Sequence, residues 1–186
     1  MAEFEPAYKH MQKHEGGYNN DPADNGGETY RGISRKNWRG WDGWPDIDRI
    51  KSDVGFSILD SELNSKLKIL NSKLNSNADL QGRVRLFYQR NFWTPTMQRL
   101  TSQDLANWLF DKGVNMGIRQ ACKLLQRAAN VDPDGIIGPQ TMAAVNAADP
   151  VVLLARCREE ASRYYVKLAL SDPSQSKFLH GWLARA

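Results

Sequence analysis

Carboxylates and glycines gather near the start of the chain, and they are the residue types of an acid–base active site. The segment runs Glu15-Gly-Gly-Tyr18-Asn-Asn-Asp21-Pro-Ala-Asp24-Asn-Gly-Gly-Glu-Thr29. A structural turn does not need so many acids and glycines in so short a run. Glycoside hydrolysis uses two carboxylates across a sugar-sized gap, one to protonate the leaving oxygen and one to activate water or meet the cation. The segment therefore indicates a hydrolytic site.

The residues before Glu15 predict a short amphipathic helix that ends at this acid. Phe4, Tyr8 and Met11 recur at helical spacing, and the two glycines that follow Glu15 are typical of a helix end. The carbonyl end of a helix favours the protonated form of an acid, and burial would raise the pKa further. A general acid must be protonated near neutral pH. Position alone leaves open an exposed Glu15 that the helix end merely tolerates.

The residues after this helix combine turn chemistry with a few β-prone positions. Asn and Asp side chains fold back on the backbone, and glycine permits positive φ. Tyr18 and the stretch from Thr29 to Ile33 are the β-prone residues nearby. We expect a small irregular hairpin beside the helix, which would return Asp21, Asp24 and Thr29 toward the helix end.

The same run resembles the signature of a known enzyme family. The pattern E-G-G-Y-x-N-D-P-x-D-x-G-G-x-T-x-x-G-I is similar to that of glycoside hydrolase family 108, N-acetylmuramidases of the lysozyme-like superfamily. Further matches follow in order along nearly the whole chain: YQRNFW at 88–93, DKGVNMG at 111–117, Leu125-Gln126, and DGIIGPQT at 134–141. The last belongs to the peptidoglycan-binding region of that family. The chain departs from the pattern at Ser34, where Thr is usual.

The resemblance implies a fold, a reaction and a domain plan. The fold would be mainly α, a lysozyme-like α+β arrangement with a small β-hairpin lobe after the first helix. Glu15 would be the catalytic acid that cleaves the bond between N-acetylmuramic acid and N-acetylglucosamine. Residues 1–96 would form the catalytic part and residues 97–186 a helical peptidoglycan-binding region, packed into one globular unit. No metal or cofactor is implied.

The second catalytic group is less closely defined. Phage-type lysozymes place an Asp nine residues after the catalytic Glu, with a Thr soon after it. Glu15, Asp24 and Thr29 keep nearly that spacing, which favours Asp24 with Thr29 positioning a water. Asp21 is the competitor, although an Asp before Pro is also an ordinary turn starter. We expect Glu28 to be a solvated charge.

Aromatic residues are candidates for saccharide binding because their faces pack on pyranose rings. Tyr18 and Asp21 lie within the motif, and the loop Gly40-Trp41-Asp-Gly-Trp44-Pro carries two tryptophans that we expect to be exposed. Filling of the hydrophobic core is the alternative for each tryptophan.

Most of the chain after this loop is predicted to be helical. Leu63, Leu67, Leu70 and Leu74 form a helical stripe that favours a surface helix packed on one face, with dimerisation as an alternative. The expected helices cover 34–38, 46–50, 57–77, 81–93, 101 or 102 to 117, 118–129, 149–170 and 177–185.

Asp111 and Asn115 are four residues apart on one of these helices, so they share a face. The family match makes both candidates for binding the saccharide or supporting Glu15. A structural hydrogen-bonding role is an equal alternative.

The loop from Asn130 to Thr141 resembles a calcium loop in part. Oxygen-bearing residues occupy positions 1, 3 and 5 and glycine occupies position 6, but Thr141 stands where a closing Glu is needed. We therefore expect a tight turn in which Asp134 and Thr141 cap the next helix, with Gly135 and Gly138 serving the backbone conformation.

The two cysteines, Cys122 and Cys157, lie among apolar helical neighbours and predict buried free thiols. Zinc-dependent amidase or endopeptidase chemistry would need metal ligands. His10 and His14 lack the HExxH pattern, and the third histidine, His180, is far away in sequence.

A net charge of +4 suits an anionic polymer such as the bacterial wall. No dense Lys/Arg block accompanies it, so nucleic acid is a poor candidate partner. Without an apolar signal segment or a membrane-length run, we expect synthesis in the bacterial cytoplasm, no stable membrane insertion, and action in the periplasm or on the wall after release.

Access to the wall would then need a holin, a secretion pore or lysis. Related proteins include phage or prophage endolysins and secretion activators. The expected partner is the peptidoglycan glycan strand. The alternative function is a non-catalytic peptidoglycan-binding or secretion-accessory protein.

Overall fold

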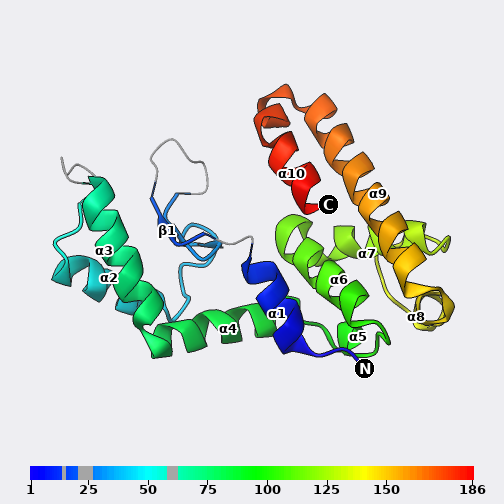
Figure 1. Ribbon diagram of the computed structural model, residues 1–186, viewed down its shortest axis with the longest axis horizontal. Helices are drawn as coiled ribbons and strands as arrows, with labels where there is room; N and C mark the ends of the chain where they lie inside the picture. Colours follow the sequence, from blue (N-terminus) through cyan, green and yellow to red (C-terminus); the bar gives the residue numbers. More distant parts are fainter. Residues whose placement is uncertain (14–15, 21–26, 58–62) are drawn as a thin grey trace. The chain divides into compact units, whose positions relative to one another are not determined.

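The computed structural model describes residues 1–13, 16–20, 27–57 and 63–186 (Figure 1). Glu15, Asp21 and Asp24 therefore lie outside the described residues. The chain forms two compact units. The first joins residues 1–14 to 92–186, and the second is formed by residues 15–91. The predicted division after residue 96 stays a prediction.

A three-stranded antiparallel sheet lies in the second unit. It consists of β1 (Tyr18–Asn19), β2 (Thr29–Tyr30) and β3 (Ile33–Ser34), in the order β1-β2-β3. Tyr18 pairs with Tyr30, and Tyr30 pairs with Ile33. The predicted small β lobe after the first helix is confirmed.

The turn between β2 and β3 explains one glycine of the motif. Arg31 and Gly32 have φ of 50° and 79°. Two consecutive residues with positive φ make the tight two-residue hairpin turn whose twist matches the flanking strands. Gly32 adopts this conformation without the steric cost of a Cβ, whereas Arg31 bears that cost.

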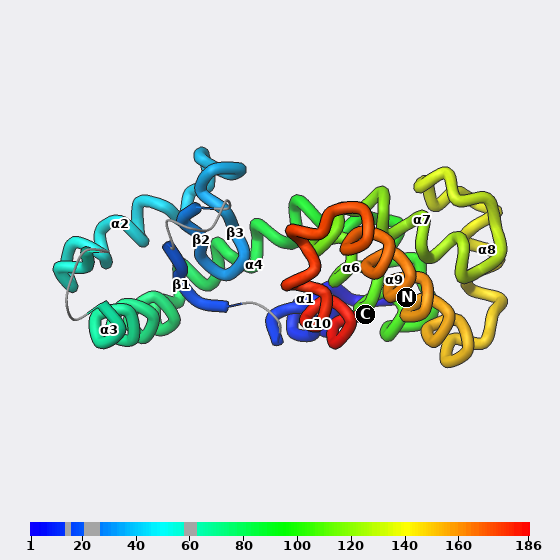
Figure 2. Tube along the Cα trace, turned by 90° about the horizontal axis from the view of Figure 1, so that it is seen from above, coloured from blue at the N-terminus to red at the C-terminus, as the bar shows by residue number. Residues whose placement is uncertain are grey.

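The described residues of the second unit also form the helices α2 (Trp44–Asp53), α3 (Leu63–Ser76) and α4 (Ala78–Phe92). The α3 helix runs beside β1 (Figure 2). Leu70 and Leu74 of the predicted stripe are fully buried, so the apolar face of α3 packs into this unit. The α2 helix is longer than predicted because Pro45, which lacks an N–H, is accommodated in its first turn.

The helix predicted from Ser34 to Trp38 is wrong. This segment is a single turn, in which the N–H of Trp38 donates to the carbonyl of Ser34 at 2.9 Å. Ser34 already pairs with Thr29 in the sheet, so its backbone is committed to β3 rather than to a helix.

Within the described residues of the first unit, helices are joined by short loops, and no strand is present. Its elements are α1 (Phe4–Gln12), α5 (Pro95–Gln98), α6 (Gln103–Met116), α7 (Ile118–Ala128), α8 (Pro139–Ala147), α9 (Pro150–Ser171), a 3₁₀ helix (Pro173–Phe178) and α10 (Leu179–Arg185). The α1 helix packs on α6, α7 packs on α6 and α9, and α10 returns along α9 (Figure 1).

Aromatic rings and side-chain caps hold these helices in place. Phe4 of α1 meets Phe110 of α6 and Trp93 edge-on, with ring centroids 5.7 and 5.8 Å apart. Ser102 caps α6, and Asp149 caps α9.

The loop before α8 is organised by a buried glutamine. The Gln126 amide nitrogen donates to the Asp134 carboxylate at 2.7 Å and to the Thr141 hydroxyl at 3.2 Å, and the Gln126 amide oxygen accepts from the N–H of Gly135 at 2.8 Å. Asp134 and Thr141 therefore hold the loop to α7 and do not cap α8, which begins after Gly138 without a side-chain cap. The capping prediction is wrong.

The two glycines of this loop differ. Gly135 has φ of 84°, and a Cβ there would lie 2.6 Å from Arg119 Cγ, so glycine is required. Gly138 has φ of −83°, and a Cβ there would meet nothing within 4 Å. The predicted conformational need holds for Gly135 only.

Cys122 and Cys157 are buried free thiols, as predicted. Burial raises the pKa of Cys122 to about 11 and that of Cys157 to about 12, so both thiols stay protonated at neutral pH.

Within residues 1–13, 16–20, 27–57 and 63–186, none of the helices has the length and apolar character to cross a membrane.

Candidate functional site

The sheet of the second unit joins the two ends of the segment that carries Asp21 and Asp24. Asn19 of β1 pairs directly with Thr29 of β2. The predicted water-positioning residue, Thr29, therefore lies on β2 beside the strand that follows the Glu-Gly-Gly-Tyr run. Its relation to Glu15 and Asp24 lies outside the described residues.

Glu28 lies at the centre of a charged network rather than in solvent. Its side chain is 14% exposed, and its carboxylate accepts from the Tyr18 hydroxyl at 2.7 Å and from Lys51 Nζ at 2.7 Å. Arg35 Nε lies 2.5 Å from its second oxygen. Arg35 in turn holds Asp48 through two hydrogen bonds of 2.6 and 3.0 Å. The prediction of a solvated Glu28 is wrong, because the chain after the hairpin brings Arg35 to it and α2 brings Lys51.

Tyr18 belongs to this network and is buried. Burial raises the pKa of its hydroxyl, and the hydrogen bond to Glu28 adds to the rise, so Tyr18 stays a neutral donor. Lys51 Nζ lies 5.2 Å from the centre of the Tyr18 ring, and Phe56 packs edge-on against it. Through Lys51, Tyr18 fixes β1 to α2. Its predicted contact with saccharide stays a prediction.

A second set of contacts ties the sheet to α3. The N–H of Tyr18 donates to Asn71 Oδ1 at 2.7 Å, and the Asn71 amide donates to the carbonyl of Leu67 at 3.1 Å. A Cβ on Gly17 would lie 2.1 Å from the same Asn71 oxygen. The second glycine of the Glu-Gly-Gly-Tyr motif is therefore needed for this close approach.

One turn further along α3, Asn75 holds the β2–β3 hairpin. Asn75 Oδ1 accepts from the Tyr30 hydroxyl at 3.2 Å and from the Arg31 guanidinium at 2.9 Å. Gln81 Nε2 of α4 donates to the same Tyr30 hydroxyl at 2.8 Å. Sequence reasoning missed the positioning residues Asn71 and Asn75, although their four-residue spacing on a predicted helix is a signal that they share a face.

The two loop tryptophans are buried, so the prediction of their exposure is wrong. Trp41 and Trp44 pack edge-on at 5.1 Å, and Trp44 Nε1 donates to the carbonyl of Trp38 at 2.8 Å. Arg35 covers the Trp44 ring at 4.4 Å. The loop folds onto α4, where the Trp41 ring packs against Phe87 with ring centroids 6.0 Å apart. Their assignment to saccharide binding has no support from these contacts.

The exposed tryptophan of this region is Trp38, at 38%. It borders a surface cleft of about 410 Å³ between the loop and α4, which also has Arg39, Arg83 and Arg90 along its walls. Trp38 stands edge-on to Phe87 with ring centroids 4.8 Å apart. An aromatic face beside guanidinium groups suits a sugar or a carboxylate.

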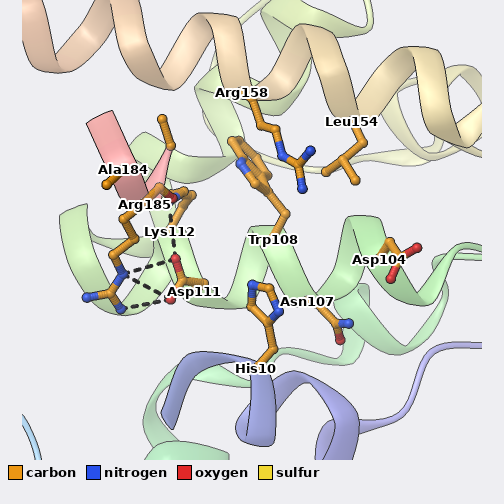
Figure 3. A pocket seen from close by; sticks show the side chains of 11 residues that line it. His10, Asp104, Asn107, Trp108, Asp111, Lys112, Leu154, Arg158, Ala184 and Arg185 are labelled. Carbon is orange, nitrogen blue, oxygen red and sulfur yellow. Dashed lines mark hydrogen bonds and ion pairs between the residues drawn. The ribbon is translucent and has the colours of Figure 1, made fainter. Parts of the chain in front are cut away.

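Asp111 lies beside a cavity of about 490 Å³ in the first unit (Figure 3). Its carboxylate accepts from Arg185 at 2.7 and 3.1 Å and from Lys112 Nζ at 3.1 Å. Lys112 also donates to the backbone carbonyl of Arg185. Asp111 is 2% exposed and Lys112 is fully buried, so this cluster joins α6 to α10.

The electrostatics of this cluster favour the ionised acid. Burial alone would raise the pKa of Asp111, but the hydrogen bonds and charge of Arg185, with Lys112, hold it below the ordinary value. Asn115 accepts from the Tyr165 hydroxyl at 2.7 Å and does not pair with Asp111. Both predicted site residues thus have structural partners, and their predicted contact with saccharide is not tested by these bonds.

The opposite walls of the same cavity carry polar groups from three helices. Figure 3 shows His10 of α1, Asn107 and Trp108 of α6 and Arg158 of α9 around it. Trp108 Nε1 is buried and has no hydrogen-bond partner among the described residues. In the part of the chain that the structure describes, no three His, Cys, Asp or Glu side chains are grouped so that they could hold a metal ion.

Comparison with known proteins assigns the class to which this fold and motif belong. The mainly helical chain with a small sheet after its first helix is a glycoside hydrolase joined to a peptidoglycan-binding region. The chain belongs to the glycosyl hydrolase 108 family, whose model matches residues 8–117. A second model, described as a predicted peptidoglycan domain, matches residues 120–186.

A solved structure supports the fold over nearly the whole chain. SagA of Brucella abortus superposes with a TM-score of 0.61 at 23% sequence identity, covering 98% of this chain and 88% of that one. A comparison with curated proteins found no match to this sequence. The family assignment confirms the resemblance drawn from the motif.

Proposed function

We propose that this hydrolase cleaves the bond between N-acetylmuramic acid and N-acetylglucosamine in peptidoglycan. The match of residues 8–117 to the glycosyl hydrolase 108 family carries the proposal, because it includes the whole acid- and glycine-rich motif. The adjoining peptidoglycan domain match supports the choice of polymer.

In this proposal Glu15 is the general acid. It protonates the glycosidic oxygen as the bond to the leaving sugar breaks and positive charge develops on the other sugar. Asp24 stabilises that charge or activates a water, and Thr29 on β2 orients the water. The pairing of Asn19 with Thr29 supports this arrangement, because it anchors the chain on either side of the segment that carries Asp24.

The contacts of Glu28 argue against it as the catalytic acid. Two cations and a tyrosine already hold its carboxylate. Both of its oxygens are therefore already engaged by partners within the fold. Glu28 is therefore a positioning residue, which leaves the acid role to Glu15.

Digestion of purified peptidoglycan tests the bond and the acid together. After digestion, borohydride reduction marks each newly formed reducing sugar. Wild-type enzyme should yield reduced muramic acid, and Glu15→Gln should lower the rate by at least about a hundredfold. Reduced glucosamine would indicate the other glycosidic bond, and new amines without new reducing ends would indicate an amidase.

Glu159→Gln is the matched control for this experiment. Glu159 is 64% exposed on α9, so the same chemical change there should leave the rate within about twofold of wild type.

We further propose that the enzyme acts in the periplasm or on the cell wall after release from the cytoplasm, in phage-type lysis or in wall remodelling that assists secretion.

A further inference from the structure

A basic groove lies between α7 and α9, within the residues that match the peptidoglycan domain. One hollow of about 330 Å³ is walled by Arg127 of α7 and by Arg163, Tyr164 and Lys167 of α9. A neighbouring hollow of about 290 Å³ is bordered by Lys123 of α7. Gln120 borders both hollows, and the two hollows together are here called the basic groove.

Helical spacing puts these side chains on facing surfaces. Gln120, Lys123 and Arg127 recur at three and four residues along α7. Glu160, with Arg163, Tyr164 and Lys167, repeats the same spacing along α9. Residues at this spacing share one helix face, so each helix contributes one continuous wall.

The groove carries an excess of positive charge. It is lined by one acid, Glu160, and by five cationic side chains: Arg119, Lys123, Arg127, Arg163 and Lys167. Glu160 is paired with Arg163 at 2.6 Å. Among the described residues, none forms an ion pair with Lys123, Arg127 or Lys167. These three cations are thus available to an anionic ligand.

The chemistry of peptidoglycan indicates which part of the polymer this groove suits. The sugar rings of the glycan strand are uncharged, whereas the peptide stems carry free carboxylates. Cations attract carboxylates, and the half-buried Tyr164 offers an aromatic surface for an alkyl side chain. The hollow beside Tyr164 falls within the size range of small-ligand sites.

We propose that the basic groove binds the carboxylate-bearing peptide stems of peptidoglycan. Binding there would hold the enzyme on stems while the residues of the hydrolase match act on the glycan. The proposal rests on peptidoglycan being the substrate, but not on Glu15 being the acid.

Binding measurements test the groove directly. The double variant Arg127→Gln with Lys167→Gln is compared with wild type in co-sedimentation with insoluble sacculi. We expect the affinity to fall about five- to thirtyfold, as the loss of two exposed charge contacts implies. The control, Lys68→Gln with Lys73→Gln, removes the same charge from exposed positions on α3 and should change affinity less than about twofold.

Soluble ligands then identify the bound part of the polymer. A synthetic stem tetrapeptide with free carboxylates should perturb the backbone NMR signals of α7 and α9 in wild type, and less in the double variant. The same peptide with its carboxylates amidated should bind at least about fivefold more weakly.

Three outcomes would overturn the proposal: equal binding to sacculi stripped of stems, equal binding of the amidated peptide, or an equal loss of affinity in the α3 control. A further variant, Arg158→Gln, removes a charge from the same helix, α9, at the wall of the cavity beside Asp111. The proposal would also be contradicted if this variant lost affinity for sacculi and the groove variant did not. Reducing-end release is scored separately, so failure of the hydrolase assignment leaves the binding result readable.

Discussion

The side-chain oxygen of Asn71 accepts a hydrogen bond from the backbone N–H of Tyr18 at 2.7 Å and occupies the space that a Cβ on Gly17 would need. This one contact ties β1 to α3, and it requires glycine at position 17, just before the strand. The strand that follows the proposed catalytic acid is positioned by a helix more than fifty residues later in the chain.

Gly17→Ala should disrupt this contact and the activity that depends on it. The new methyl group would displace the Asn71 amide, shift β1 and lower the rate of reducing-end release by at least about tenfold. Gly16→Ala is the matched control, because a Cβ there meets nothing within 4 Å. Asn71→Gly on the Gly17→Ala background removes the clash and should recover part of the rate. No difference between the two alanine variants would contradict the role of Asn71.

Glu28→Gln should lower stability because it weakens three contacts at once. Its carboxylate accepts from Tyr18 and Lys51 and pairs with Arg35, and hydrogen bonds to charged groups contribute about 1.5–3 kcal/mol each. We expect the free energy of unfolding in urea to fall by about 2 kcal/mol. Glu159→Gln on the exposed face of α9 should change it by less than about 0.5 kcal/mol. Equal small changes in both would mean that the network does not hold the sheet.

Asp111→Asn should destabilise the first unit strongly at neutral pH. It leaves Lys112 fully buried without its counter-charge, and breaking a buried pair in this way costs about 3–5 kcal/mol. Asp104→Asn, an exposed acid beside the same cavity, is the control.

The effect of Asp111→Asn on the free energy of unfolding depends on pH, and the direction follows from the pKa of Asp111. The folded-state pKa of Asp111 lies below its ordinary value of 3.8, so its stabilisation is present above that pH. It is lost as the pH falls through the folded-state pKa. The gap in unfolding free energy between wild type and Asp111→Asn should therefore be largest near neutral pH and narrow below about pH 4. A gap that widens in acid would contradict the assigned ion cluster.

Gly135→Ala should destabilise the loop before α8, whereas Gly138→Ala should not. The first substitution places a Cβ against Arg119 at a positive φ, and it strains the turn that Gln126 holds. We expect the melting temperature to fall by several degrees, as a loss of about 1–2 kcal/mol implies. Gly138→Ala should leave it unchanged or raise it slightly. The reverse order would show that the loop is organised differently.

Much of the helical framework could be predicted from local sequence. Ser102 and Asp149 are cap residues ahead of apolar runs, and the structure uses both as caps. The stripe ending in Leu70 and Leu74 marks the buried face of α3. These features depend on neighbours within a few residues, which is why the sequence suffices.

Contacts between distant residues could not be predicted in the same way. Trp41 and Trp44 read as exposed because Gly and Pro surround them, but the loop folds onto α4 and buries both. Glu28 is predicted to be a solvated charge, yet it forms ion pairs with Arg35, which follows the hairpin, and with Lys51 of α2. Local patterns carry no information about such partners.

The rate of reducing-end release by Glu15→Gln on purified peptidoglycan is the most direct test of the central claim. The variant should remain folded, should bind sacculi as wild type does, and should release reduced muramic acid at least about a hundredfold more slowly. A folded Glu15→Gln enzyme that releases reduced muramic acid as fast as wild type would contradict the assignment of Glu15 as the general acid.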